Sequence, residues 1–411
     1  MFSSASLALG AHGISRGGLV LSSVVMARGL ATEDFAAYSY FRETVLLIAT
    51  YAALGLGVTA TRCFAAAEVD RLDGEHPLPG SLSSLSLVAS LLASSVVVAI
   101  PGTWITAEFA IPRWLLATAV GLAAFEVVPI NAVVGLERYR AVVLLAFMYA
   151  IVVVATAWWS VTLGDAIVGM CGLIGGSLAQ AMGSYVVVHR AIGWRAMTEG
   201  AVLRLRSLRG ALRIAGPMFA TSLIVVTGNW LVGRLMLEEP EGDRVFALYA
   251  VGRQWYGLGL VIPAMVSRVL LPRLVRVKSS GGEDMRGLVR LSTAVATVSA
   301  IIVAAIVVPL GPWLVSFYGH RYAGATWLIA AFMAVAVVTS PARALSNPIL
   351  ANDGQLRLLA LTGGWLILLL GVSWLALRSG LGVWAGALSQ AVAMAYLGIA
   401  AYVYCRRRRL I

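Results

Sequence analysis

Long apolar segments alternate with short polar ones along nearly the whole chain. Each apolar segment has about 20 residues, which is the length of an α-helix that crosses the roughly 30 Å core of a bilayer. The ten-residue segments of alternating polarity that are typical of transmembrane barrels are absent. The pattern predicts an all-α polytopic membrane protein with about 12 transmembrane helices, at residues 5–28, 36–60, 82–100, 114–135, 141–160, 166–188, 212–236, 246–267, 289–309, 325–345, 358–377 and 382–404.

One eight-residue segment recurs at an offset of 211 residues, as FAAYSYFR over Phe35–Arg42 and as FALYAVGR over Phe246–Arg253. This repeat predicts two lobes of six helices each. Because six is even, both lobes would start on the same side of the membrane, as parallel repeats do. We expect an N-lobe at 1–190, a basic cytoplasmic linker at 191–211, a C-lobe at 212–405 and a basic cytoplasmic tail at 406–411.

The composition agrees with a membrane protein, since 60% of the residues are hydrophobic, 12% are charged and the mean hydropathy is +0.88. Soluble domains are nearer one half apolar and one quarter charged. With the N-terminus inside, 21 of the 31 Lys and Arg residues fall on the cytoplasmic side and six on the other side. The positive-inside rule therefore predicts that both termini are cytoplasmic. It also explains the net charge of +12 without a nucleic-acid partner.

Residues with catalytic or metal-binding spacing are not found in the sequence. The four histidines are scattered, the three cysteines do not suggest a disulfide framework, and the extramembrane loops are too short for a catalytic domain. The first apolar segment lacks a basic region before it, so we interpret it as a span rather than a cleavable signal. We expect no enzyme activity, no cofactor and no metal.

Four arginines lie inside the predicted spans: Arg16, Arg42, Arg253 and Arg343. Arg42 and Arg253 occupy matched places in the repeat, about seven residues or roughly 10 Å inside their segments. Arginine is expensive at such depth and should face water or a partner. We therefore predict that Arg16, Arg42 and Arg253 bind substrate, and that Arg343, near the end of its helix, is an interfacial anchor.

Two acids are the candidate internal counter-ions, and they cannot neutralise all four arginines. Glu126 could pair with an arginine, carry a coupled proton or bond within its own lobe. Glu43 cannot face the same way as Arg42, because adjacent helical positions diverge by about 100°. Among the aromatic residues, Trp255 and Tyr256 are the better candidates for substrate contact, whereas Tyr38 and Tyr249 are predicted to belong to an aromatic belt.

Several segments carry a family resemblance: ARGLATEDFAAYSYFRETVLLIATYAALGLGVTATRCFA, VVGLERYRAVVLL, GPMFATSLIVVTGNWLVGRLML and FALYAVGRQWYGLGLVIPAMVSRVLLPRL. The chain resembles, over essentially its whole length, the polysaccharide-transporter (O-antigen flippase) family of the multidrug/oligosaccharidyl-lipid/polysaccharide superfamily. The motifs are loose and specify the fold better than the substrate.

The resemblance implies two six-helix lobes around a central cavity, in the bacterial cytoplasmic (inner) membrane. It implies a substrate as well: an oligosaccharide linked to a polyprenyl diphosphate and moved to the outer leaflet. Related lipid II flippases carry arginines in helices 1, 2 and 8, which fall here on Arg16, Arg42 and Arg253. The planar fork of arginine suits a diphosphate. Asn229 stands where relatives often have an acid, which weakens the case for cation coupling through the seventh helix.

Three other functions compete with the flippase. A drug/cation antiporter of the same superfamily would favour acids in its cavity. A glycan polymerase or glycosyltransferase would usually need a larger outer loop or a clear acid motif. A transport-inactive scaffold for glycan enzymes remains open. The expected partners are the lipid-linked oligosaccharide, membrane lipids and, in glycan assembly, polymerases or glycosyltransferases.

Overall fold

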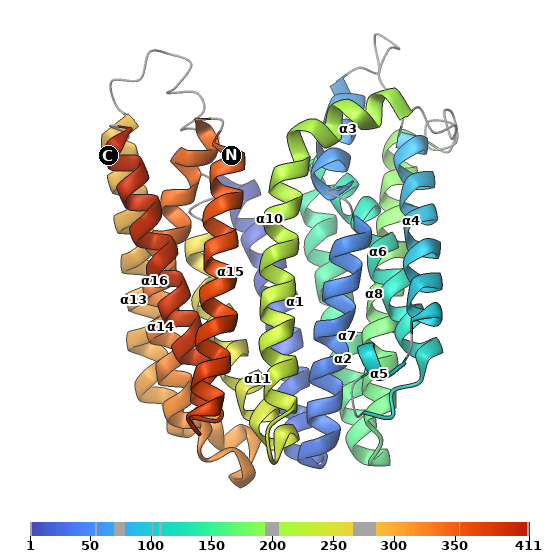
Figure 1. The fold of residues 1–411 in the computed structure, drawn as a ribbon. Helices are drawn as coiled ribbons and strands as arrows, with labels where there is room; N and C mark the ends of the chain where they lie inside the picture. The colour runs from blue at the N-terminus through green and yellow to red at the C-terminus, as the bar shows by residue number, and fades with distance from the viewer. Residues whose placement is uncertain are drawn as a thin grey trace. The chain divides into compact units, whose positions relative to one another are not determined.

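The computed structural model describes residues 2–53, 56–69, 79–100, 102–106, 109–193, 205–265, 285–352, 354–408 and 411. Helices account for almost all of these residues (Figure 1). Their bounds are α1 Phe2–Gly29, α2 Thr32–Ala53, α3 Leu56–Val69, α4 Pro79–Ala99, α5 Gly102–Ile105, α6 Arg113–Gly135, α7 Tyr139–Leu163, α8 Ala166–Ile192, α10 Leu205–Leu237, α11 Gly242–Gly259, α13 Met285–Tyr318, α14 Ala325–Ala351, α15 Gln355–Arg378 and α16 Trp384–Arg407, with a short 3₁₀ helix η1 at His320–Tyr322. The predicted all-α fold is confirmed.

Nine of the helices within the described ranges are long and apolar enough to cross a membrane: α4, α6, α7, α8, α10, α13, α14, α15 and α16. The predicted spans that are not among these nine correspond to α1, α2 with the start of α3, and α11. These helices carry Arg16, Arg42 and Arg253. The predicted substrate-binding residues therefore lie on helices that are not among the nine long and apolar ones.

Several helices extend beyond the predicted spans. The predicted end at residue 309 is too early, since α13 continues through Pro309 and Pro312 to Tyr318. A proline removes one backbone hydrogen bond, but neighbouring groups in a membrane bundle can satisfy the carbonyl that it leaves. Helix α10 begins earlier than predicted, at Leu205, which lies inside the predicted linker. Residues 194–204 of that linker and residues 409–410 of the predicted tail lie outside the described residues.

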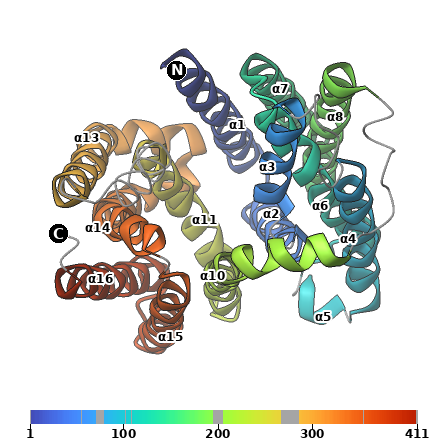
Figure 2. The ribbon, with the colours of Figure 1, turned by 90° about the horizontal axis from the view of Figure 1, so that it is seen from above.

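The chain forms two compact units, Met1–Phe219 and Ala220–Ile411. In unit 1, α6 packs against α2, α4 and α8, and α7 packs against α8. In unit 2, α14 packs in the same way against α11, α13 and α16, and α15 packs against α16 (Figure 2). The pairing scheme therefore repeats, with α6 and α14 as the central helices. Their apolar windows are 50% and 61% buried, the two highest values among the nine spans.

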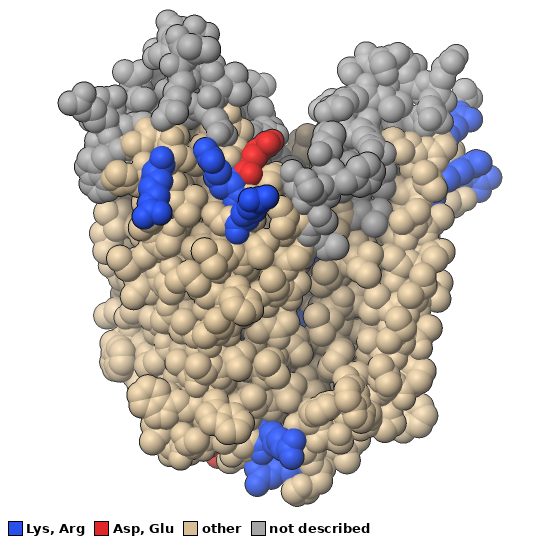
Figure 3. All heavy atoms as spheres, turned by 180° about the vertical axis from the view of Figure 1, so that it is seen from behind, with Lys and Arg blue, Asp and Glu red and all other residues tan. Residues whose placement is uncertain are grey.

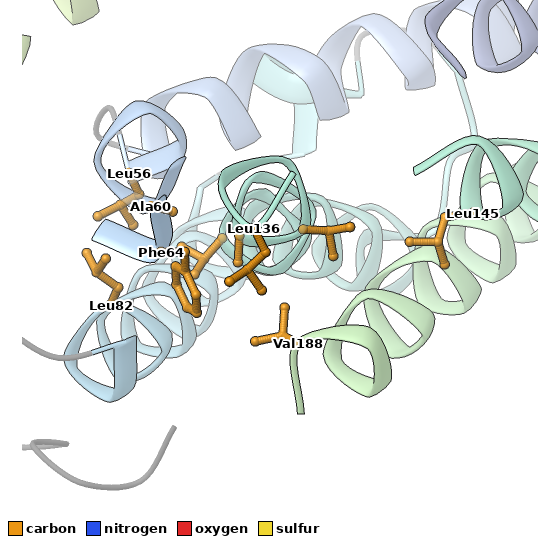
Figure 4. Packing of buried hydrophobic residues seen from close by; sticks show 10 residues of the cluster. Leu56, Ala60, Phe64, Leu82, Leu136, Leu145 and Val188 are labelled. Atoms are coloured by element: carbon orange, nitrogen blue, oxygen red, sulfur yellow. The ribbon is translucent and has the colours of Figure 1, made fainter. Parts of the chain in front are cut away.

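Apolar side chains from several helices hold one end of unit 1 together (Figure 4). The cluster contains Phe64 of α3, Leu82 of α4, Leu136 at the end of α6, Leu145 of α7 and Val188 of α8. Between α7 and α8 the chain turns at Gly164, which has φ +67, and Asp165 caps α8 by accepting a hydrogen bond from the Ile167 amide at 2.8 Å. Local turn chemistry thus makes α7 and α8 antiparallel neighbours.

Serines tie α4 to the central helix of unit 1. Ser86, Ser90 and Ser94 donate hydrogen bonds to the carbonyl oxygens of Phe125, Gly121 and Ala117, at 3.0, 2.5 and 2.9 Å. The first of these bonds has a specific cause. Pro129 has no amide hydrogen, so the Phe125 carbonyl four residues earlier lacks its helical donor. Ser86 supplies the missing donor.

Charged side chains avoid the middle of the lateral surface. On the face drawn in Figure 3, the charged side chains of the described residues gather toward the two ends, and the surface between is almost entirely formed by other residues. Large exposed apolar side chains, among them Trp114, Leu144, Trp158, Trp327 and Ile367, cover the helices. This distribution is expected of a surface that is solvated by lipid.

Candidate functional site

Arg42 lies in a polar layer between α1 and α2 of unit 1. Its Nη1 donates a hydrogen bond to the Ser23 hydroxyl at 3.1 Å. Tyr38, one helical turn earlier on α2, is fully buried, and its hydroxyl lies 3.3 Å from that of Ser22. The spacing of four residues puts Tyr38 and Arg42 on one face of α2. On that face they contact the adjacent residues Ser22 and Ser23 of α1. Arg42 is half-buried.

A second tyrosine connects this layer with other helices of the unit. Tyr149 of α7 interacts electrostatically with Arg42, Arg16, Tyr38 and Glu126. Side chains of α1, α2, α6 and α7 therefore converge around one phenol. Close packing of α1 on α7 supports the arrangement, because a Cβ added to Gly18 would lie 2.6 Å from the Ala150 Cβ. Arg16, two residues before Gly18, is exposed.

Glu126 lies on the central helix α6 and hydrogen-bonds with Ser177 of α8. Its Oε2 atom is buried and has no hydrogen-bond partner among the described residues. Glu43, the other predicted acid, is half-buried on α2 beside Arg42. The structure thus places Arg16, Arg42 and Glu126 around Tyr149, and the roles of Glu126 and Glu43 stay predictions.

In unit 2, Arg253 repeats the relation that Arg42 has to its own tyrosine. The Arg253 guanidinium carbon lies 5.8 Å from the centre of the Tyr249 ring, one turn earlier on α11. Tyr249 is 3% exposed and packs against Phe332 of α14 and Gly386 of α16. Arg253 is half-buried. Both units therefore contain a tyrosine followed four residues later by an arginine, Tyr38 with Arg42 on α2 and Tyr249 with Arg253 on α11.

The aromatic residues after Arg253 have different surroundings. The Tyr256 hydroxyl lies 3.2 Å from the Thr339 hydroxyl and accepts a hydrogen bond from Gln390 Nε2 at 3.3 Å. Trp255 is half-buried, and its indole Nε1 is buried without a hydrogen-bond partner in the part of the chain that the structure describes. The side-chain Nε2 of Gln254 is in the same situation. Contact of Trp255 and Tyr256 with substrate stays a prediction.

The predicted aromatic belt is wrong for Tyr38 and Tyr249. Both side chains are buried within their units, with 0% and 3% of their surface exposed, whereas belt residues face the lipid headgroups. The sequence could not separate the two environments, because tyrosine has an apolar ring and a polar hydroxyl and therefore suits both. Arg343, the predicted anchor, is exposed on α14.

Sequence reasoning did not identify several polar residues of these clusters: Ser22, Ser23, Tyr149, Ser177, Gln254, Thr339 and Gln390. Tyr149 and Gln390 had a usable signal, since each is a large polar side chain inside a long apolar helix. Such residues usually face a bundle interior or a water-filled cavity. The serines and Thr339 had none, because hydroxyl groups are common in membrane helices and often bond to their own backbone.

Comparison with known proteins identifies what the chain is similar to. Residues 3–278 match the family model described as "Polysaccharide biosynthesis protein". The EPS I polysaccharide export inner membrane protein EpsE of Ralstonia nicotianae is 24% identical over 302 residues, which is 67% of this chain. The alignment spans 64% of the length of that relative.

Two solved structures share the fold. An inward-facing multidrug resistance MATE family transporter of the MOP superfamily superposes with a TM-score of 0.76 at 16% identity, over 98% of each chain. A MOP superfamily transporter from Pyrococcus furiosus, described by a binding pocket of reverse polarity, gives a TM-score of 0.72 at 16% identity over 98% of this chain and 94% of that chain. At such identity the likeness establishes the fold alone.

Proposed function

Because the chain belongs to the polysaccharide biosynthesis protein family, we propose that it is a transporter that moves a polyprenyl-diphosphate-linked oligosaccharide across the cytoplasmic membrane. The substrate would enter from the cytoplasmic leaflet and leave on the outer leaflet, for assembly of a cell-surface polysaccharide. The two units would alternate in access to the two sides, as the lobes of related transporter folds do. The protein would act as a carrier and not as an enzyme.

The observation that carries the proposal is the tyrosine–arginine pair that occurs in both units, Tyr38 with Arg42 and Tyr249 with Arg253. An arginine at a span centre costs about 2.5–3.5 kcal/mol of insertion free energy. Two arginines in matched positions therefore indicate a functional role. In each pair the tyrosine is buried, whereas the arginine is half-buried.

The chemistry of the arginines favours an anionic substrate. Each guanidinium can donate two parallel charge-assisted hydrogen bonds to one phosphate, whereas a lysine would act as a point charge. In the proposed mechanism Arg16, Arg42 and Arg253 bind the diphosphate. The polyprenyl chain remains in the lipid. The indole N–H of Trp255, which has no hydrogen-bond partner among the described residues, supports a contact with sugar hydroxyls, and Tyr256 would pack against a sugar ring.

The proposal includes the lobe and membrane arrangement derived from the sequence. The lobes would be 1–190 and 212–405, joined by the basic segment 191–211, with both termini and the 406–411 tail in the cytoplasm. Anionic lipids would contact the basic ends, and glycan polymerases or glycosyltransferases would act before or after transport. A reporter fused at residue 411 should be active in the cytoplasm, and activity on the outer side would contradict the orientation.

A drug/cation antiporter is the second candidate, because the fold is that of MATE transporters. A cationic ligand needs carboxylates at its site. The unit 1 cluster instead contains Arg16 and Arg42 beside one carboxylate, Glu126, and the unit 2 cluster contains Arg253. The excess of arginine favours the glycan carrier over the antiporter.

The test is complementation of a strain that lacks its polysaccharide flippase. We expect the wild-type protein to restore surface glycan and to leave resistance to cationic drugs unchanged. Membrane abundance is measured in parallel by a C-terminal tag. Restored drug resistance without surface glycan would favour the antiporter. Surface glycan that is restored equally by a protein lacking all three arginines would favour the scaffold.

A further inference from the structure

Glu126 is a buried ionisable group that the proposed transport mechanism does not use. One of its carboxylate oxygens, Oε2, is buried and has no hydrogen-bond partner among the described residues, although the carboxyl group also bonds with Ser177. An ionised carboxylate with an unsatisfied oxygen in a low-dielectric bundle is unfavourable. A buried polar atom of this kind indicates that a ligand or a proton completes the group.

Helices α2, α3, α4, α7 and α8 pack on α6, which carries Glu126. Tyr149 of α7 interacts with Glu126 electrostatically, and Ser177 of α8 hydrogen-bonds with it. Tyr185, also on α8, stacks its ring on that of Phe125, the residue before Glu126, at 5.3 Å. From α2, Arg42 and Tyr38 act on the same Tyr149, as does Arg16 of α1. Cys63 of α3 packs against the apolar cluster to which α6 contributes. After Pro79 and Gly80, α4 contains only serines and apolar residues. Tyr149 thus interacts electrostatically both with the Glu126 carboxylate and with Arg16 and Arg42.

We propose that Glu126 is a proton-binding site, and that its protonation is coupled through Tyr149 to anion binding at Arg16 and Arg42. This inference rests on the proposed function, since it assumes that the arginines bind the diphosphate. It assigns unit 1 a second site, for a proton, next to the substrate site.

The chemistry of the site fits a proton better than a metal ion. Within the described ranges, no group of three His, Cys, Asp or Glu side chains comes together that could hold a metal. Glu126 offers one carboxylate, and its hydroxyl partner Ser177 can donate to the ionised group or accept from the protonated one. A proton bound at Oε2 forms an O–H bond and removes the buried negative charge, and its release to water restores the carboxylate.

The coupling follows from charge. While Glu126 is ionised, it offsets part of the positive potential that Tyr149 experiences from Arg16 and Arg42. A diphosphate at the arginines adds negative charge near the carboxylate, which favours uptake of a proton. By linkage, a protonated Glu126 must then favour binding of the anion to the same extent.

The experiment measures the reaction of Glu126 with dicyclohexylcarbodiimide, which labels protonated carboxyl groups in apolar surroundings. The purified full chain is labelled in lipid nanodiscs over about pH 5 to 9 in choline buffer, and the peptide that contains Glu126 is quantified by mass spectrometry. Above the midpoint, labelling should fall about tenfold per pH unit. Inorganic pyrophosphate should move that midpoint to higher pH.

Three variants make the result specific. Glu126→Gln should remove the label from the peptide, whereas Glu241→Gln, at an exposed residue paired with Arg244, should change neither the label nor its pH dependence. Tyr149→Phe should retain pH-dependent labelling and reduce the pyrophosphate effect. If Glu126→Gln does not fold, the wild-type titration and Tyr149→Phe still decide the question.

The outcomes separate this inference from the proposed function. Labelling that does not change with pH, or that does not occur, would overturn the proton site even if the arginines prove essential for export. Labelling that titrates but ignores pyrophosphate would overturn the coupling. A protein that restores no glycan export but shows both effects would contradict the proposed function and leave the proton site supported.

Discussion

Units 1 and 2 share a packing scheme but differ in the polar side chains at its centre. In unit 1 the polar cluster holds two arginines and a carboxylate around Tyr149. In unit 2 it holds Arg253 and a neutral network of Tyr256, Thr339 and Gln390. With Pro129 of α6 aligned to Pro341 of α14, Val338 stands where unit 1 has Glu126. The repeated features are the helix pairs and the tyrosine–arginine pair, whereas the ionisable acid is confined to unit 1.

This difference suggests a division of tasks. The features that both units keep fit a ligand with two phosphate groups, such as a diphosphate. Features found in one unit, such as Glu126 and its serine partner, would serve a task that occurs once per transport cycle, such as binding of one proton. The variants below test the shared features first and the packing beneath them afterwards.

The largest effect is expected from removing both shared arginines. Loss of one charge-assisted hydrogen bond costs about 1.5–3 kcal/mol, or roughly 10- to 150-fold in affinity, so the double variant Arg42→Ala, Arg253→Ala should abolish export. Lysine at either position should restore it only in part, because it keeps the charge and loses the fork. The measurement is surface glycan per unit of membrane protein in the flippase-null strain.

Arg343→Ala provides the matched control, because Arg343 also lies in a predicted span but is exposed on α14. It should retain export. Equal loss of export in Arg343→Ala and in the double variant would mean that arginines in the spans act through insertion or folding. The comparison of the two units would then carry no information on substrate.

A smaller effect is expected from the packing that brings Arg16 to Tyr149. In Gly18→Ala the new Cβ would meet the Cβ and Cα of Ala150 at 2.6 and 2.8 Å, so α1 and α7 must separate. Such overpacking costs about 1–3 kcal/mol. The apparent melting temperature in detergent should fall, and export should fall with it.

Gly17→Ala is the control for this change, since a Cβ at Gly17 meets nothing within 4 Å. It should be neutral or slightly stabilising, as alanine is a better helix former than glycine. If both variants lose the same stability, backbone flexibility of α1 matters more than its contact with α7.

The smallest effect concerns the proline of the central helix. Ser86→Ala should cost about 0.5–1.5 kcal/mol, because the Phe125 carbonyl then loses its donor. Adding Pro129→Ala returns an amide hydrogen at position 129 and should remove most of that penalty. A double-mutant cycle on the melting temperature reads the coupling directly. Additive losses would show that Ser86 does not compensate for the proline.

The all-α fold could be predicted from the sequence, because it rests on a local pattern. Apolar runs of about 20 residues set the spans, whereas substrate binding by Arg16, Arg42 and Arg253 stays a prediction. The surroundings of Glu126 could not be predicted, since Tyr149 and Ser177 come from other helices. The burial of Tyr38 and Tyr249 was missed for a related reason: whether a tyrosine of α2 or α11 is buried depends on the helices that pack against it.

The most direct test of the central claim is translocation by purified protein in proteoliposomes. A polyprenyl-diphosphate oligosaccharide carrying a fluorescent sugar is placed in both leaflets, and dithionite quenches the label that reaches the outer leaflet. We predict rapid loss of the inner-leaflet signal with the wild-type protein. With the double variant Arg42→Ala, Arg253→Ala the translocation rate should be lower by about 10- to 150-fold or more. Equal rates for the two proteins, or no translocation by a folded wild-type protein, would contradict it.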